Sequence, residues 1–417
     1  MLARMAAIVF IFLCTTAAWA VLGSTVMHRT TTQDESLKSA VGQLWGTQQR
    51  QLAPQLYYQT IKQTKIETVK GDKLVTETKD EAVNHPLLLN ASDLKVNLHL
   101  DHRQKGLLWY STYRVGFGGK YRVANYTEEE REVFFNFSMP TKDGVYDNFR
   151  FTVGGKELPN LQFNEGTLSH KIKLAPGQSE TVEVAYGSQG MDEWWYDFGA
   201  SVNQVKNFSL AMQTDFDQID FPQSSISPTQ KTPTGNGWEL KWQYASLLSG
   251  VKIGMAMPRK LNPGPWVSQI TYAAPVSLFL FFFIVFVLTT VKRIRLHPMN
   301  YFFLGAAFFS FHLLLAYLVD HISIHLAFLI CSVVSIFLVV SYLRLVVGNR
   351  FAFVEAGILQ FVYLVLFSYT FFFERFTGLA ITILCILTLF VVMQFTGRVD
   401  WDTLFRRSET NPINTTT

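Results

Sequence analysis

Long apolar runs lie toward both ends of the chain, and a mixed polar region separates them. Six of the runs are long enough to cross a bilayer: 6–26, 270–291, 300–319, 322–346, 351–373 and 377–397. A helix needs about 20 apolar residues for this crossing. Inside lipid the backbone must satisfy its own hydrogen bonds, as it does in a helix. The pattern therefore predicts six transmembrane helices.

The first apolar run has two interpretations. Ala18-Trp19-Ala20 resembles a signal-peptidase site that follows a short apolar stretch. The apolar character nevertheless continues to Val26, which is long enough for a membrane-spanning helix. We therefore expect an uncleaved anchor helix over residues 1–27. Either interpretation exports the region that follows.

Residues 28–93 have a more polar pattern. A helix is predicted first, with four apolar residues on one face: Leu37, Val41, Leu44 and Trp45. A polar strand–turn–strand pattern then surrounds Gly71-Asp72, which predicts an exposed hairpin. This region is expected to be separate from the domain after it.

Residues 94–256 alternate between apolar and polar positions, as half-buried strands do. Strands are predicted at 132–139, 149–153, 194–199, 206–214 and 238–244, and on both sides of a Pro-Gly turn within 170–186. Many short strands with turn residues between them favour a β-sandwich over alternating strands and helices.

The whole chain is therefore predicted to be an α+β membrane protein. An N-terminal anchor helix precedes an exported all-β, sandwich-like domain, and a bundle of five transmembrane helices follows it. Residues 257–269 form the predicted juxtamembrane linker, residues 270–397 the helical bundle, and residues 398–417 the cytoplasmic tail.

The net charge of +4 lies entirely with the apolar runs and their flanks. Residues 28–269 carry 26 basic and 26 acidic side chains and are formally neutral. A neutral domain is a poor partner for nucleic acid, so we exclude nucleic-acid binding. Basic residues beside long apolar runs indicate membrane topology, with the lipid bilayer as partner.

Basic side chains mark alternate ends of the apolar runs. Lys292, Arg293 and Arg295 follow the second run, and Arg350 follows the fourth. Short loops rich in Lys and Arg stay on the cytoplasmic side. This places both termini in the cytoplasm and exports residues 28–269.

Cysteine usage agrees with this topology. Cys14, Cys331 and Cys385 all lie in predicted membrane helices. The exported region therefore has neither disulfides nor cysteine metal ligands. No sequence pattern indicates a cofactor.

Several segments resemble the inner-membrane CreD family, also called Cet. The strongest similarity lies in the turn after the second run, at Arg295, Leu296, His297, Pro298 and Met299. Arg103, Gly106 and Tyr113 match a second family pattern. The resemblance implies a bacterial inner-membrane protein with residues 28–269 in the periplasm. It also implies a link to a two-component system and to envelope stress, without assigned catalytic residues.

Candidate chemistry in the membrane region is sparse. Asp320, His321 and His325 lie close together in the sequence, and two imidazoles one turn apart beside a carboxylate can bind zinc or copper. Ordinary polar residues at a helix end explain the same spacing, so we assign no metal. Arg344 and Glu355 flank a short turn and are expected to pair with each other.

In the exported domain, the segment Trp194-Trp195-Tyr196 is a candidate for stacking on a sugar. Strand alternation requires at least one of these rings to be part of the core. No catalytic constellation accompanies them, so we predict a non-enzymatic envelope protein. Its expected partners are envelope proteins or a sensor kinase. The alternative is a transporter or channel subunit with an accessory periplasmic domain.

Overall fold

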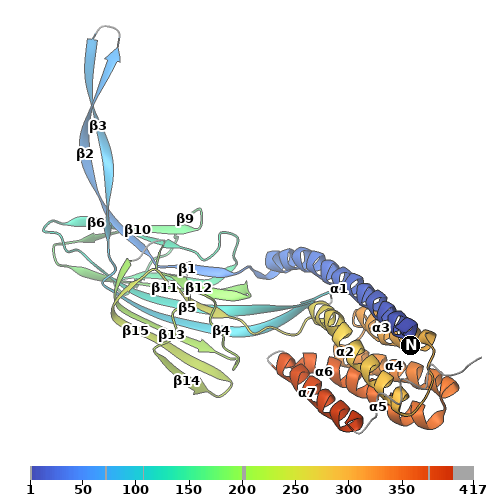
Figure 1. Ribbon diagram of the computed structural model, residues 1–417. Helices are drawn as coiled ribbons and strands as arrows, with labels where there is room; N and C mark the ends of the chain where they lie inside the picture. Colours follow the sequence, from blue (N-terminus) through green and yellow to red (C-terminus); the bar gives the residue numbers. More distant parts are fainter. Residues whose placement is uncertain (1, 71–72, 107, 200–202, 374–375, 398–417) are drawn as a thin grey trace, which may run out of the picture. The chain divides into compact units, whose positions relative to one another are not determined.

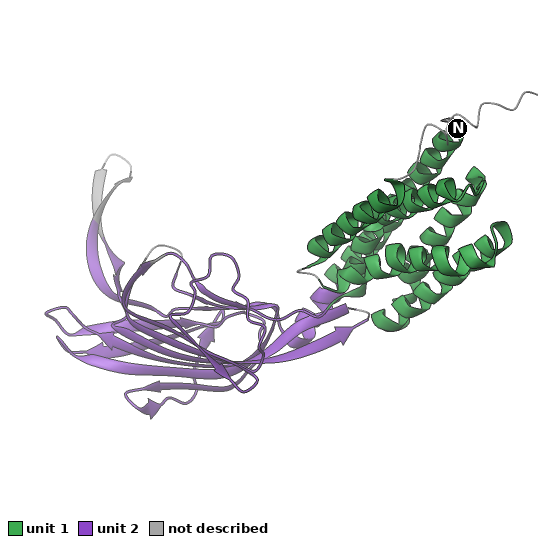
Figure 2. Cartoon of the chain, turned by 60° about the horizontal axis from the view of Figure 1, so that its bottom comes forward, with its two compact units in different colours: residues 1–35, 261–417 green, residues 36–260 purple. Residues whose placement is uncertain are grey.

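The computed structural model describes residues 2–70, 73–106, 108–199, 203–373 and 376–397. The chain divides into two compact units, which Figure 2 colours separately. Unit 1 comprises residues 1–35 and 261–417, and unit 2 comprises residues 36–260. The first helix, α1 (Leu2–Trp45), contributes to both units.

Unit 1 is helical. Its long helices after α1 are α2 (Pro263–Val291), α3 (Pro298–Leu318), α4 (Ile324–Val346) and α7 (Thr377–Thr396). Between α4 and α7 the chain forms short helical pieces: η1 (Phe351–Ala356), α5 (Gly357–Gln360), η2 (Phe361–Leu366), α6 (Phe367–Tyr369) and η3 (Thr370–Phe372). With these pieces taken as one segment, six helices in the described residues have the length and composition to cross a membrane. The apolar runs therefore form helices, as the sequence predicts.

The contacts of α1 give the directions of the first helices in unit 1. Along α1, Trp19 packs its ring 5.3 Å from His312 of α3, and Arg29 forms an ion pair with Asp320, just after α3. Both sequence positions increase together, so α1 and α3 are parallel. The hydroxyl of Ser268 in α2 donates to the Gly23 carbonyl, whereas Phe279, later in α2, meets Phe12. α2 is therefore antiparallel to α1.

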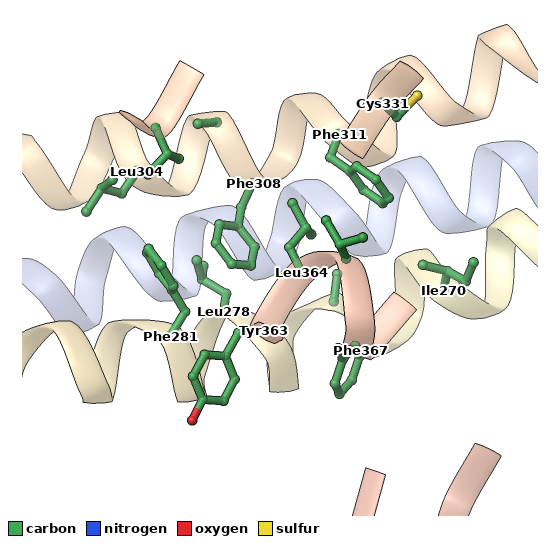
Figure 3. Close-up of a cluster of buried hydrophobic side chains, with 14 of the residues drawn as sticks. Ile270, Leu278, Phe281, Leu304, Phe308, Phe311, Cys331, Tyr363, Leu364 and Phe367 are labelled. Carbon is green, nitrogen blue, oxygen red and sulfur yellow. The ribbon is translucent and has the colours of Figure 1, made fainter. Parts of the chain in front are cut away.

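Aromatic and aliphatic side chains fill the centre of unit 1. Phe281 of α2 and Phe308 of α3 are fully buried, with ring centroids 4.7 Å apart (Figure 3). Leu364 and Phe367 of the fifth segment lie in the same cluster. Because lipid is as apolar as these side chains, close packing contributes more to helix association than removal from water does.

The fifth segment is irregular because η1 and η2 are π-helical. Gln360 lies at the end of α5, fully buried, and donates a hydrogen bond to Ser335 Oγ of α4 at 2.8 Å. Ser335 in turn donates to the Ala307 carbonyl of α3 at 3.2 Å. These bonds join three helices through side chains that would otherwise be costly to bury in lipid.

Unit 2 contains three sheets (Figure 1). The eight-stranded sheet has the order β14 (Gln230–Thr234), β15 (Gly237–Ser249), β13 (Asn203–Thr214), β4 (Ala91–Lys105), β5 (Leu108–Ala124), β11 (Ser179–Met191), β7 (Tyr146–Val153) and β8 (Lys156–Glu157). The five-stranded sheet has the order β3 (Lys73–Leu87), β2 (Gln55–Lys70), β6 (Arg131–Ser138), β10 (Thr167–Leu174) and β9 (Phe163–Asn164). The three-stranded sheet has the order β1 (Gln49–Leu52), β12 (Glu193–Asp197) and β16 (Ile253–Ala256).

The two larger sheets share one hydrophobic core. The ring centroid of Phe135 in β6 lies 5.9 Å from that of Tyr121 in β5 and 5.9 Å from that of Phe151 in β7. Both β5 and β7 belong to the other sheet. Alternate residues of β6 are buried, as its sequence pattern predicts. Side chains of two sheets meeting in one core define a sandwich. The predicted α+β fold class with a sandwich-like domain is confirmed.

Two predicted turns have different outcomes. β2 and β3 form an antiparallel hairpin that extends from its sheet in Figure 1, and the predicted turn residues Gly71-Asp72 lie outside the described residues. The strands around Pro176-Gly177, by contrast, do not pair with each other, because β10 joins the five-stranded sheet and β11 the eight-stranded sheet. Asn125 stabilises this crossing, since its amide donates to the Leu174 carbonyl at 2.9 Å.

The end of α1 packs on unit 2 through the apolar face predicted for it. Val41 is buried with Tyr110 and Met191, and Leu37 and Trp45 lie against them. The fourth predicted member of this face, Leu44, is 76% exposed. Anchor and amphipathic segment form one continuous helix.

Candidate functional site

The segment most similar to the CreD family forms the connection between α2 and α3. Pro298 is the first residue of α3, where its missing N–H removes no helical bond. Before it, His297 caps the helix by accepting a hydrogen bond from the Met299 amide at 3.2 Å. Leu296 is buried in the core of unit 1, whereas Arg295 is exposed. The segment therefore fixes the start of α3 and leaves one cation at the surface.

Two of the three residues considered for a metal have other side-chain contacts. Asp320 pairs with Arg29 at 2.8 Å, and the ring of His325 stacks on Phe372 at 5.0 Å. The third residue, His321, is exposed in the turn after α3. Among the described residues, no group of three or more His, Cys, Asp or Glu side chains is placed to hold a metal ion.

Removal of the Arg29–Asp320 ion pair should destabilise unit 1. The Arg29 guanidinium also donates to the Ala316 carbonyl at 3.2 Å and lies 5.8 Å from the Tyr317 ring. We expect Arg29→Ala and Asp320→Ala each to lower the free energy of unfolding by about 1 kcal/mol. The double variant should lose less than the sum, because both substitutions remove one shared interaction. Thermal unfolding of the four proteins in detergent measures this coupling.

Exposed Arg295, in the α2–α3 connection, provides a matched control. Arg295→Ala should leave the unfolding temperature close to that of the unmodified protein. Strictly additive losses in the Arg29 and Asp320 variants would show that the pair contributes nothing to stability.

Glu355 pairs with a different cation from the one expected. Its carboxylate contacts Lys292 Nζ, in the turn after α2, and not Arg344. η1 lies against the end of α2, where Lys292 Nζ is also 5.9 Å from the Phe351 ring. Arg344, by contrast, is exposed on α4 beside an open apolar groove with Phe353 and Phe361. A functional role for Arg344 and Glu355 stays a prediction.

In unit 2, the three-stranded sheet presents the side chains of Arg50 and Trp195 on one face. β1 and β12 are parallel, and β12 and β16 are antiparallel. Their registers place Arg50, Trp195 and Gly254 side by side across the sheet. The neighbours Trp194 and Tyr196 point to the opposite face and are fully buried. The alternation thus assigns two of the three candidate rings to the core and Trp195 to the surface.

Two contacts hold the Trp195 indole in place. Its Nε1 donates to Glu193 Oε2 at 2.9 Å, and the same oxygen accepts from Gln48 Nε2 at 2.7 Å. The ring also lies against Gly254, where any Cβ would approach ring carbons to 2.6 Å. Glycine at position 254 is therefore required for this placement of the ring.

A charged group lies beside this ring. Asp197 is 2% exposed and accepts from Arg50 Nε at 2.5 Å, with Lys252 Nζ at 3.6 Å from the same oxygen. Its other oxygen accepts from the Gly199 amide at 3.0 Å. Two cations share this buried carboxylate, so their positive charge is only partly neutralised.

These residues border a cleft of about 470 Å³, within the usual size range of ligand sites. Gln48, Arg50, Trp195 and Lys252 line it, together with Gln223 and Ser224 from the turn before β14. On the buried face of the sheet, desolvation raises the pKa of the Tyr196 hydroxyl, so that group remains uncharged at neutral pH. The cleft therefore combines one aromatic surface, two cations and several neutral hydrogen-bonding groups.

The sequence identified the aromatic part of this cleft but missed its charged part. Arg50 and Lys252 are 147 and 55 positions from Asp197, and neither lies in a recognisable motif. The local signal present was the alternation in β12, which requires Trp195 to face away from Trp194. Strand pairing, which brings Arg50 and Lys252 to this point, leaves no comparable local signature.

The fold and this arrangement define a multi-span membrane protein that carries a large β-sheet unit between its first two membrane helices in sequence. The chain belongs to the family of inner membrane protein CreD, whose sequence model matches residues 1–260 and 268–402. This match confirms the resemblance found in the α2–α3 connection.

No curated protein matches the chain. The chain is similar to a crystal structure from Legionella pneumophila that is described as a nutrient binding protein. The two sequences are 9% identical and the TM-score is 0.31, and the match covers 47% of this chain and 74% of that chain. An M1 zinc metallopeptidase from Deinococcus radiodurans is 8% identical, with a TM-score of 0.24, 40% of this chain and 42% of that chain covered. Similarity at this level carries no argument about function.

Proposed function

We propose that this protein is a non-enzymatic, multi-pass protein of the bacterial inner membrane whose β-sheet unit binds envelope components in the periplasm. Both termini are cytoplasmic in this proposal, and residues 28–269 are periplasmic. The protein then acts in cell-envelope integrity and in a stress response linked to a two-component system. Family membership supports the membrane location, and the resemblance supports the role in the envelope.

The distribution of basic residues carries the proposal. Lys292, Arg293 and Arg295 are exposed in the α2–α3 connection, and Arg350 is exposed just before η1. Such short basic connections remain in the cytoplasm. At the opposite end of α3, the cation Arg29 is neutralised by Asp320. The cleft beside Trp195 supports ligand binding by unit 2.

The transport alternative requires a polar path through unit 1. Two cavities in the described part of this unit are lined mostly by apolar side chains, such as Phe337 and Phe361 in one and Phe279 and Phe283 in the other. Both are open grooves, since Phe337, Phe361 and Phe279 are at least half exposed, and their apolar lining suits lipid chains, so neither supplies such a polar path.

Cysteine labelling tests the topology. In a background with the three native cysteines replaced by alanine, Lys156→Cys places a thiol in exposed β8 and Asn349→Cys places one between α4 and η1. A membrane-impermeant maleimide should label position 156 in spheroplasts, because unit 2 faces outward in the proposal. Position 349 should be labelled only after lysis. The reverse pattern would rule out the proposed function.

A further inference from the structure

The cleft on the three-stranded sheet has the chemistry of a saccharide site. The flat indole of Trp195 offers an apolar surface for the C–H face of a pyranose ring. Around the ring, Gln48, Gln223 and Ser224 can exchange hydrogen bonds with hydroxyl or amide groups. Rigid aromatic surfaces with a few convergent polar groups are typical of small-ligand sites.

The charges of the cleft indicate which saccharides fit. Both acidic groups near Trp195 are already engaged, since Glu193 Oε2 accepts two hydrogen bonds and Asp197 is buried beneath its two cations. By contrast, the side chain of Arg50 is 50% exposed and that of Lys252 is 31% exposed. Arg50 uses Nε and Nη2 on Asp197 and has further N–H groups to donate. A ligand therefore meets cations in this cleft, with the carboxylates behind them.

We propose that this cleft binds a sugar that carries a carboxylate, with the ring on Trp195 and the carboxylate near Arg50 and Lys252. The inference deepens the proposed function, because it names the class of envelope component that unit 2 would bind. Most lining residues are exposed, so the cleft is open enough for an internal unit of a glycan chain.

Two probes that differ in one group test the proposal. N-acetylmuramic acid and N-acetylglucosamine share the ring and the acetamido group, and the first adds a lactyl carboxylate. We expect the full-length protein in detergent to bind the acid about tenfold more tightly, as measured by calorimetry, because a charge-assisted hydrogen bond is lost with the neutral sugar. Sodium lactate, which has the carboxylate without a ring, should bind at least tenfold more weakly than the acid.

Substitutions assign the effects to the cleft. Trp195→Ala should lower the affinity for both sugars about tenfold or more, and Trp195→Phe should recover part of this loss of affinity. Lys252→Gln should reduce the ratio of the two affinities, acid to neutral sugar, about threefold, and it should leave the affinity for the neutral sugar unchanged. Lys142, which pairs with Glu165 at 3.1 Å outside the cleft, provides the matched control, and Lys142→Gln should change neither affinity.

Two outcomes of these binding measurements would overturn the inference. Equal affinities for the two sugars would eliminate the carboxylate preference, and binding insensitive to Trp195→Ala would place the ligand elsewhere. Co-sedimentation with peptidoglycan glycan strands from which the stem peptides have been removed, so that the lactyl carboxylates are free, distinguishes a polymer from the free sugar as ligand. Because these measurements use purified protein, they do not depend on the topology, and cysteine labelling can fail while sugar binding succeeds, or the reverse.

Discussion

Gly46→Ala is expected to destabilise unit 2 by about 3 kcal/mol or more. Gly46 connects the last turn of α1 to β1, and its φ is +120°, a backbone conformation that side-chain-bearing residues rarely adopt. An added Cβ would also lie 2.3 Å from the Gln189 carbonyl oxygen. Backbone cannot rotate away as a side chain can, so β1 would have to move from β11. Thermal unfolding of the purified chain should show a decrease of about 6–12 °C for unit 2.

Gly235, between β14 and β15, provides the control for this substitution. Its φ is outside the positive range, and no atom lies within 4 Å of a Cβ built there. Gly235→Ala should therefore change the unfolding free energy by no more than about 0.5 kcal/mol. If both variants unfolded at the same temperature, the close approach of Gly46 to β11 would be incorrect. Because β1 supplies Arg50, Gly46→Ala should also weaken ligand binding in the cleft.

The membrane part of the fold could be predicted from sequence because its signal is local. A span such as α4 is one uninterrupted apolar run, and the cost of unpaired backbone groups in lipid requires a helix. Pro298 likewise specifies the start of α3 within a few residues. The π-helical stretches of the fifth segment left no such signal, since their sequence is as apolar as that of a regular helix.

In unit 2 the sequence predicted strands better than their partners. Alternation in β6 identifies a strand, and the sheet it joins depends on residues far along the chain. The Pro176-Gly177 turn illustrates the difference, because a local pattern typical of a hairpin connects two sheets. Strands β4 and β5, which lie at the centre of the larger sheet, were recognised only by the general alternation after residue 94.

The same distinction applies to the candidate site. Trp195 was identifiable because aromatic residues and strand alternation are visible in one short segment. The ion pairs of Glu355 and Asp320 were not identifiable, since their partners Lys292 and Arg29 are 63 and 291 positions away. Ionic contacts of this kind follow from helix packing, and the sequence predicts that packing only in outline.

Trp266→Ala should be the most destabilising substitution in unit 1, with a loss of about 3–5 kcal/mol. Trp266 lies near the start of α2 and is 2% exposed. Its ring centroid lies 4.5 Å from that of Phe372 and 6.2 Å from that of Phe328, so it joins α2 to α4 and to the fifth segment. Its Nε1 donates to the Phe371 carbonyl at 3.2 Å. Alanine would remove the ring contacts and the hydrogen bond to the Phe371 carbonyl, and it would leave a cavity.

Two further variants separate these contributions. Trp266→Phe keeps an aromatic ring and removes the N–H. It should lower the free energy of unfolding less than Trp266→Ala does, because phenylalanine loses the hydrogen bond but largely fills the space that alanine leaves empty. Phe390 in α7 is 58% exposed, and Phe390→Ala should have little effect, because lipid replaces the lost side chain. Thermal unfolding in detergent should therefore rank unmodified protein and Phe390→Ala first, Trp266→Phe next and Trp266→Ala last. Equal losses for Trp266→Ala and Phe390→Ala would mean that Trp266 faces lipid, as an interfacial aromatic would, and does not hold these helices together.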